Sequence, residues 1–230
     1  MTRLRFGTLI VSLLLSQCAL AQLVKSVDWT MLADPEAKHF EDPYRELSSD
    51  QFRALMALAQ LKADLANASK KEVRAELNER ISALSRGLEA QGLDPDWILA
   101  QRETVAERRR HAALATNAEL EGEDVELSGY LLVASEVDGG ARVAYLLPDR
   151  GVCMHLPPAA PNQLVRLAIE HLPEPLAPCI GASVRGRLAT RETRTKVPVF
   201  DKVVMFWSRW QLDVSEAITA GPPQEDDDRS

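Results

Sequence analysis

The sequence has few cysteines, few aromatic residues and no excess of basic residues. Its 230 residues include 3 cysteines, which are too few for a disulfide-rich scaffold. The formal net charge is -7, so nucleic acid is not an expected partner. Hydrophobic residues make up 46% and charged residues 27%, a balance that is typical of globular proteins and excludes wholly disordered or fibrous chains.

The motifs of several large enzyme classes are also missing. The chain has no glycine-rich phosphate loop, no Gly-x-Ser-x-Gly nucleophile turn and no His-Glu-x-x-His zinc motif. It has no acidic loop with the spacing of a calcium site either. Because no complete catalytic set is present, we expect a protein that is not an enzyme.

Residues 1–21 have the features of a secretory signal peptide. Two early arginines precede an apolar stretch from Phe6 to Leu15, and small residues follow as far as Ala21. The stretch is too short for a permanent membrane-spanning helix, which needs about 20 residues. We expect cleavage after Ala21, with a lipoprotein signal at Cys18 as the alternative. No later segment is long and apolar enough to span a membrane, so the mature chain is expected to lie in the bacterial periplasm.

Residues 22–120 show helical periodicity after an extended lead. Ser48 and Gln51 have the spacing of a capping box at the start of a helix, and a second helix is expected to start at Ser69. A third start is Asp94, which is followed by a proline at the first helical position. The short connections predict that the three helices pack as a small bundle or as a hairpin arm.

One basic cluster, Arg108 to His111, lies near the end of the third expected helix. The acidic residues Glu103 and Glu107 lie close to this cluster on the same expected helix. We therefore expect the cluster to be a solvated helix face with local ion pairs.

Residues 121–216 show the alternating pattern of β-strands. Apolar positions alternate from Val125 to Val133, and the Asp-Gly-Gly sequence from Asp138 predicts a hairpin turn. About five short antiparallel strands predict an OB-like β-barrel, with a β-sandwich as the alternative, so the fold class is α+β. Residues 217–230 form an acidic tail that has no apolar surface to bury, so we expect this tail to be disordered.

A turn with unusual side chains separates the second and third expected strands. The turn contains a thiol, an imidazole, three prolines and an amide pair: Cys153, His155, Pro157, Pro158, Pro161, Asn162 and Gln163. The prolines stiffen the segment, and a stiff surface loses little entropy on binding. These residues are therefore a candidate binding surface for a partner or a small ligand. The alternative is a structural turn in which the two amides bond carbonyl groups of their own segment.

Cys153 and His155 are two residues apart, so they share one face of an extended segment. A thiolate and an imidazole suit Zn²⁺ or Cu⁺, and His171 and Cys179 are the available further ligands. A structural role is the alternative, in which Cys153 is buried or forms a disulfide with Cys179. A third interpretation is a reactive thiol at Cys153 that His155 activates.

The segment from Gly151 to Gln163 resembles the Gly-x-Cys-x-His-x-Pro-Pro-x-x-Pro-Asn-Gln signature of DUF3299, an exported bacterial family of unknown function. The resemblance covers about residues 124–215, and a Trp-x-x-Leu element at Trp29 is similar as well. Some members of the family occur beside ABC transporters, which implies an accessory role in the cell envelope. The chain departs from the family pattern at Ala159 and Ala160, which replace part of a proline-rich run.

Together these features predict a non-enzymatic periplasmic binding or adaptor protein that is accessory to an ABC transporter, with the transporter permease as a candidate partner. The alternative is a metal-handling protein that binds Zn or Cu through Cys153 and His155. A thiol enzyme is the third hypothesis.

Overall fold

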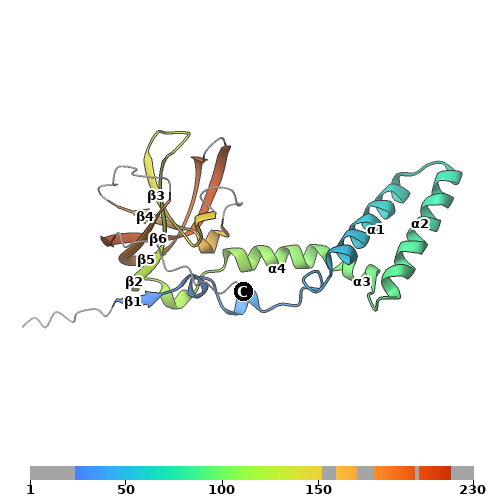
Figure 1. The fold of residues 1–230 in the computed structure, drawn as a ribbon, viewed down its shortest axis with the longest axis horizontal. Coiled ribbons are helices and arrows are strands. Elements are labelled where there is room, and N and C mark those ends of the chain that lie inside the picture. Colours follow the sequence, from blue (N-terminus) through green and yellow to red (C-terminus); the bar gives the residue numbers. More distant parts are fainter. Residues whose placement is uncertain (1–23, 152–158, 170–178, 200–201, 219–230) are drawn as a thin grey trace, which may run out of the picture.

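A computed structural model describes four stretches of the chain: residues 24–151, 159–169, 179–199 and 202–218. Within these stretches a helical N-terminal part precedes a strand-rich C-terminal part, so the fold is α+β as predicted. The strands gather at one end of the molecule, and a pair of long helices extends away from them at the other (Figure 1). The predicted signal peptide and the final residues of the predicted acidic tail lie outside the described stretches.

The segment before the first long helix contributes to both parts. β1 (Lys25–Val27) pairs in parallel with β2 (Asp124–Ser135), although the sequence predicted only an extended lead and helices here. A 3-10 turn, η1 (Trp29–Leu32), follows because the carboxylate of Asp28 accepts two backbone N–H groups of that turn. A second turn, η2 (Glu36–Lys38), leads toward the helices.

Two antiparallel helices, α1 (Ser49–Asn67) and α2 (Lys71–Glu89), form an arm that stands away from the strands (Figure 1). α1 begins with the predicted capping box, in which Gln51 N donates to Ser48 Oγ and Ser48 N donates to Gln51 Oε1. α2 begins after Lys70 without a side-chain cap, slightly later than the start predicted at Ser69.

The turn at the tip of the arm is closed by an arginine of α2. Arg74 Nη1 donates to the carbonyl oxygens of Leu65 and Ala68 at 2.9 and 3.0 Å. Carbonyl groups at the end of a helix lack helical partners, so this guanidinium serves as a cap for α1. The arm has its own core at the opposite end, its base, where four apolar side chains are buried together: Leu55, Leu58, Leu88 and Ile98.

Two further helices, α3 (Pro95–Ala100) and α4 (Arg102–Leu114), return the chain to the strands. Asp94 Oδ1 accepts the backbone N–H of Trp97 at 2.9 Å, which is the start that the sequence predicted. The single predicted third helix is divided at Gln101, and α4 spans the distance between the arm and the strands (Figure 1). None of the helices in the described part of the chain combines the length and the apolar composition that crossing a membrane requires.

The strands form one mixed sheet of six members. The strands that follow β2 are β3 (Arg142–Leu147), β4 (Val165–Ala168), β5 (Ile180–Val199) and β6 (Lys202–Ile218). Antiparallel pairing joins β2 to β3, β3 to β4, β5 to β6 and β5 to β2, whereas β4 and β6 pair in parallel. The order of pairing therefore passes from β2 through β3, β4, β6 and β5 and returns to β2.

The main core lies between these strands and the lead segment. Trp210 on β6 and Leu32 in η1 are both fully buried in it. Trp210 Nε1 donates to the carbonyl oxygen of Leu32 at 3.2 Å, and Trp29 Nε1 donates to that of Ser128 at 2.8 Å. The lead segment is thus fixed to the sheet by two indole N–H groups as well as by the pairing of β1 with β2.

Candidate functional site

Most of the turn that the sequence singled out lies outside the described residues. This applies to Cys153, His155, Pro157 and Pro158, and also to His171. Their proposed roles in a binding surface, a disulfide or a metal site therefore remain predictions.

Asn162 fixes the described end of this turn to α4. Pro161–Gln163 form a 3-10 turn, η4, in which Asn162 is only 2% exposed. Its Nδ2 donates to the carbonyl oxygens of Ala112 and Ala115, each at 2.7 Å, at the end of α4 where helical partners run out. Asn162 is therefore a contact inside the protein rather than part of an exposed surface.

Gln163 behaves differently from its neighbour. Its Nε2 donates to the carbonyl oxygen of Asn162 at 3.1 Å, and its side chain is half-buried. The sequence predicted, as one alternative, that both amides bond carbonyl groups of their own segment. Gln163 does so, whereas Asn162 bonds the carbonyl groups of α4 instead.

Cys179 is disulfide-bonded and buried next to the start of β5. The two other cysteines, Cys18 and Cys153, lie outside the described residues, so the Cys153–Cys179 pairing remains a prediction. A disulfide sulfur is not a thiolate, so Cys179 in this state is not the metal ligand that the sequence also allowed. Within the described stretches, no group of three or more His, Cys, Asp or Glu side chains could hold a metal ion.

An ion pair joins the lead segment to α4 at the base of the arm. The side chain of Asp42 is only 1% exposed, and Arg109 donates to it through Nε at 2.8 Å and through Nη2 at 3.0 Å. Arg45 adds a second guanidinium at 3.2 Å. Two parallel hydrogen bonds fix direction as well as distance, so this pair determines how α4 meets the lead segment.

Tyr44 extends these contacts to α3. Its hydroxyl donates to the carbonyl oxygen of Ile98 at 2.8 Å, and the guanidinium of Arg109 lies 5.9 Å from the centre of its ring. We call Asp42, Tyr44, Arg45 and Arg109 the arm-base cluster. The cluster connects the lead segment, α3 and α4 at the point where the arm begins.

The pKa of Asp42 is lowered in the folded protein. Burial is the largest single effect and raises this pKa, but the hydrogen bond and the charge of Arg109 outweigh it, with help from the backbone N–H of Tyr44 and the charge of Arg45. The same hydrogen bond raises the pKa of Arg109. Both partners are therefore charged at neutral pH.

A groove of about 540 Å³ lies beside the arm-base cluster, and we call it the arm groove. Five large apolar residues line it: Phe40, Leu47, Leu93, Trp97 and Ile98. Apart from the paired Asp42, its charged lining consists of three acidic residues and one arginine: Glu41, Glu46, Asp94 and Arg45. The groove therefore combines an apolar wall with an excess of negative charge.

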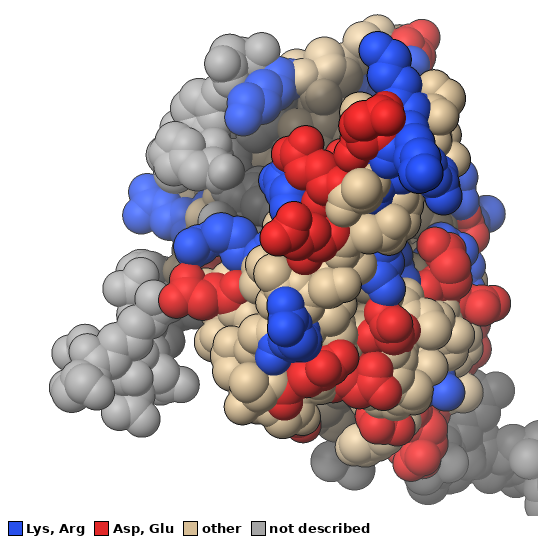
Figure 2. All heavy atoms as spheres, turned by 90° about the vertical axis from the view of Figure 1, so that its right-hand side faces the viewer, with Lys and Arg blue, Asp and Glu red and all other residues tan. Residues whose placement is uncertain are grey.

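The arm end of the molecule carries acidic and basic side chains interspersed with uncharged residues (Figure 2). Phe52 and Val73 are 46% and 43% exposed on the arm helices, and Trp97 is 43% exposed in the arm groove. Single apolar side chains on a surface are normal and need no partner. The arm groove, where apolar side chains converge, is therefore the stronger candidate for a binding site.

The sequence did not predict the arm-base cluster. Arg109 was expected to pair with acidic residues of its own helix, and this expectation was wrong, because its partner Asp42 lies 67 residues earlier. Ion pairs on one helix recur at fixed spacing, whereas a pair across two segments has no such spacing.

Comparison with known proteins assigns the family. The family described as "Protein of unknown function (DUF3299)" matches residues 29–203, well over half of the chain. A crystal structure of a DUF3299 family protein from Pseudomonas aeruginosa PAO1 is 13% identical over 87% of this chain and 98% of that chain, with a TM-score of 0.43, a likeness too weak to support conclusions. No curated protein matches. From the match over residues 29–203, and as the sequence resemblance predicted, the chain belongs to the DUF3299 family.

Proposed function

We propose that this protein is a non-enzymatic binding or adaptor protein of the bacterial periplasm, and that the arm groove holds a protein partner in the cell envelope. The observation that carries this proposal is the convergence of Phe40, Leu47, Leu93 and Trp97 on one open groove. Removing such side chains from water contributes about 25 cal/mol per Å² of apolar area, part of which offsets the entropy that association costs. An aromatic side chain such as Trp97 is a common centre of protein interfaces.

The charges around the arm groove favour a basic partner. Three carboxylates, those of Glu41, Glu46 and Asp94, line the groove. The one cation in the described lining is Arg45, and it is already paired with Asp42. The whole chain has a net charge of -7, which favours encounter with a positively charged surface. The partner segment therefore presents an apolar side chain that is flanked by lysine or arginine. The family resemblance suggests a permease of an ABC transporter as its source.

The arm-base cluster gives the groove a fixed shape before binding. Asp42 and Arg45 belong to the groove lining, and the bond from Tyr44 to Ile98 ties one wall to α3. A surface that is already ordered loses little entropy when a partner binds. This rigidity supports a role in recognition.

A location outside the cytosol is supported by the disulfide at Cys179. Disulfide bonds persist in oxidising compartments such as the bacterial periplasm and are rare in the cytosol. The predicted signal peptide over residues 1–21 agrees with the same location.

For the strand-rich part we propose an OB-like barrel. The support is the order of pairing, which leaves β2 through β3 and returns to it through β5. Such a return distinguishes a closed sheet from an open one. The alternative β-sandwich divides its strands between two sheets, whereas the described strands belong to a single sheet.

In-cell photo-cross-linking tests the adaptor role. A photo-reactive phenylalanine analogue is placed at Trp97 in the arm groove, and at Val203 as the control, because Val203 is 59% exposed but lies on β6. After irradiation, we expect the Trp97 position to yield a conjugate with a membrane transporter component and the Val203 position to yield none. Recovery of no transporter component at Trp97, or of the same products at both positions, rejects the proposal.

A charge variant tests the chemistry of the partner. Glu46→Lys introduces a cation at the groove, so the amount of the conjugate should fall several-fold. Glu79→Lys is the matched control, because it makes the same change on an exposed position of α2 that does not line the groove. An equal loss for both variants contradicts the assignment of the partner to the arm groove.

A further inference from the structure

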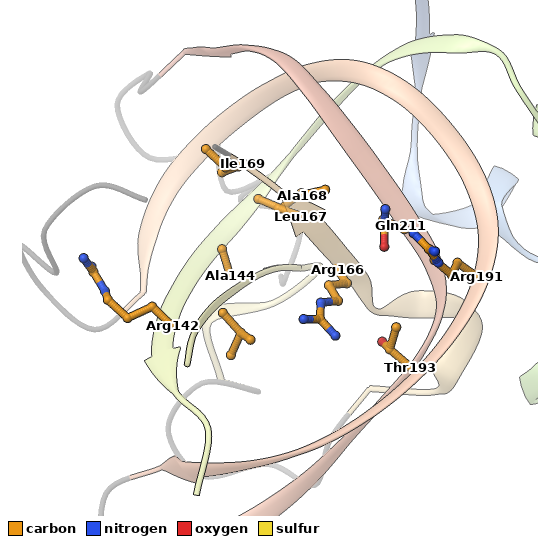
Figure 3. A pocket seen from close by; sticks show the side chains of 10 residues that line it. Arg142, Ala144, Arg166, Leu167, Ala168, Ile169, Arg191, Thr193 and Gln211 are labelled. Atoms are coloured by element: carbon orange, nitrogen blue, oxygen red, sulfur yellow. The ribbon is translucent and has the colours of Figure 1, made fainter. Parts of the chain in front are cut away.

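A second hollow, of about 450 Å³, opens on the sheet far from the arm groove (Figure 3). It lies where the start of β3, the end of β4 and the middle of β5 and β6 come together. Among the described residues that line it are three arginines and no aspartate or glutamate. In a chain with a net charge of -7, this concentration of positive charge is unusual.

A β-bulge brings one of these arginines to the hollow. Between Thr190 and Thr193, β5 advances by one residue more than β6 does between the paired Trp210 and Ser208. The extra residue falls in the segment that contains Arg191, which lines the hollow. Bulges redirect side chains and occur often beside binding sites.

Two of the three arginines, Arg166 and Arg191, have at most one distant carboxylate partner among the described residues. The side chain of Arg191 makes no hydrogen bond or ion pair with the described part of the chain, and its neighbour Glu192 is already bonded to Arg194 at 2.9 Å and to Arg209 at 2.8 Å. Arg166 points into the middle of the hollow from β4, and its one carboxylate partner, Glu136, is distant at 3.8 Å (Figure 3). The third arginine, Arg142, points away from these two in the same view.

Polar and apolar groups complete the lining. The side chains of Thr193 and Gln211 also line the hollow, and Gln211 Nε2 donates one hydrogen bond to Asp213 Oδ1 at 2.7 Å. Leu167 and Ile169 add apolar surface on the side of β4.

We propose that this hollow binds a small organic anion, with the anionic group held by Arg166 and Arg191 and a short apolar chain lying against Leu167 and Ile169. Gln211 Nε2 donates one of its two hydrogens to Asp213 Oδ1, and its second N–H supplies a hydrogen bond to the anionic group. A guanidinium binds carboxylate and phosphate groups through the same paired N–H donors, so both are candidates. The proposal does not depend on the adaptor role, because none of these residues lines the arm groove.

Calorimetric titration of the mature, disulfide-bonded chain tests this site. The probes are hexanoate and hexyl phosphate, with uncharged hexanamide and inorganic phosphate as controls. We expect one of the two organic anions to bind saturably, and both controls to bind at least about tenfold more weakly. The two anions also distinguish a carboxylate ligand from a phosphate ligand. No saturable binding of either anion below about 10 mM, or equal binding of either control, overturns the proposal.

Variants locate the binding reaction within the hollow. Arg166→Gln and Arg191→Gln should each weaken the better probe about tenfold or more, because each removes one charged donor. Arg80→Gln is the matched control, since this arginine is exposed on α2 and does not line the hollow. We expect it to change affinity by less than about twofold. If it weakens binding as much as the other two, the effect is one of general charge and the site is not in this hollow.

Discussion

Arg109 on α4 donates two hydrogen bonds to the carboxylate of Asp42, at 2.8 and 3.0 Å. Asp42 belongs to the lead segment that also supplies β1 and η1 to the sheet. The pair therefore links the lead segment to α4, and Tyr44 extends the link to α3. The geometry of the arm groove depends on this link, because Asp42 is part of the groove lining.

Removal of the guanidinium should destabilise the base of the arm. Arg109→Met keeps most of the side-chain volume but leaves the buried Asp42 carboxylate with Arg45 as its remaining cationic partner. Because Arg109 is itself half-exposed, we expect a loss of about 1–3 kcal/mol in the free energy of unfolding, below the range for fully buried pairs. Urea denaturation measures the loss.

The matched control for this variant is an exposed ion pair on α1. Arg53 and Asp50 are 77% and 89% exposed, so Arg53→Met should change the free energy of unfolding by less than about 0.5 kcal/mol. Equal losses for Arg109→Met and Arg53→Met contradict the special role of the buried pair.

The lowered pKa of Asp42 predicts a specific dependence of stability on pH. A carboxyl whose pKa is lower in the folded than in the unfolded chain stabilises the folded state fully above its unfolded value, here 3.8, and loses this contribution as the pH falls through the folded pKa. The contribution is thus present at neutral pH and lost below a pH of about 3.8.

Thermal unfolding of the Asp42→Asn variant between neutral and acidic pH isolates this effect from the other carboxyl groups. The variant should melt well below the wild-type protein at pH 7, because asparagine cannot form the charged pair with Arg109. The difference should narrow as the pH falls below about 3.8. A constant difference across this range shows that protonation of Asp42 does not control the stability of the arm base.

Local signals account for what the sequence predicted correctly. Ser48 and Gln51 cap each other three residues apart, and Asp94 caps the turn that it precedes. Such bonds need only one turn of chain, so they are visible as short patterns. The change from helical to alternating periodicity near residue 121 lies close to Asp124, where β2 begins.

Contacts between distant segments account for most of what was missed. β1 has three residues and pairs in parallel with β2, with Lys25 opposite Val125. An element this short has no detectable periodicity in the sequence. The bulge that brings Arg191 to the hollow depends on how β5 registers against β6, which is set by packing of the whole sheet. The two proposed binding sites, the arm groove and the second hollow, thus depend on tertiary contacts that patterns in a single sequence do not encode.

The hydrogen bonds from Asn162 to the end of α4 should contribute measurably to the free energy of unfolding. Asn162→Ala removes the side-chain donor to the carbonyl groups of Ala112 and Ala115, of which Ala115 keeps the backbone N–H of Asp34, at an expected cost of about 1–3 kcal/mol. Asn162→Asp should be worse, because a carboxylate faces the same two carbonyl oxygens. Denaturant titration gives the loss, and hydrogen exchange should show faster opening at the end of α4.

Gln163→Ala is the control for Asn162. Its side chain is half-buried and bonds only the neighbouring carbonyl, so its loss should cost less than about 0.5 kcal/mol. Similar effects at both positions indicate that the turn as a whole, and not the bond from Asn162 to α4, stabilises this region.

Two glycines that look equivalent in the sequence should respond to alanine in opposite directions. A Cβ at Gly186, beside a register shift between β5 and β6, would lie 2.2 Å from the carbonyl oxygen of Asp213 and 3.0 Å from Val214 Cα. These are backbone atoms of a paired strand, so the clash is relieved only by separating β5 from β6, at an expected cost of about 3 kcal/mol or more.

Gly87, on an exposed turn of α2, has no atom within 4 Å of the position of a Cβ, so Gly87→Ala should stabilise the helix by about 0.5–1 kcal/mol. Thermal unfolding of both variants makes the comparison under identical conditions. A lowered midpoint for Gly186→Ala beside a raised one for Gly87→Ala agrees with close backbone contact at the shift. An unfolding midpoint of Gly186→Ala equal to that of the wild-type protein contradicts the close approach of β5 and β6 at this position.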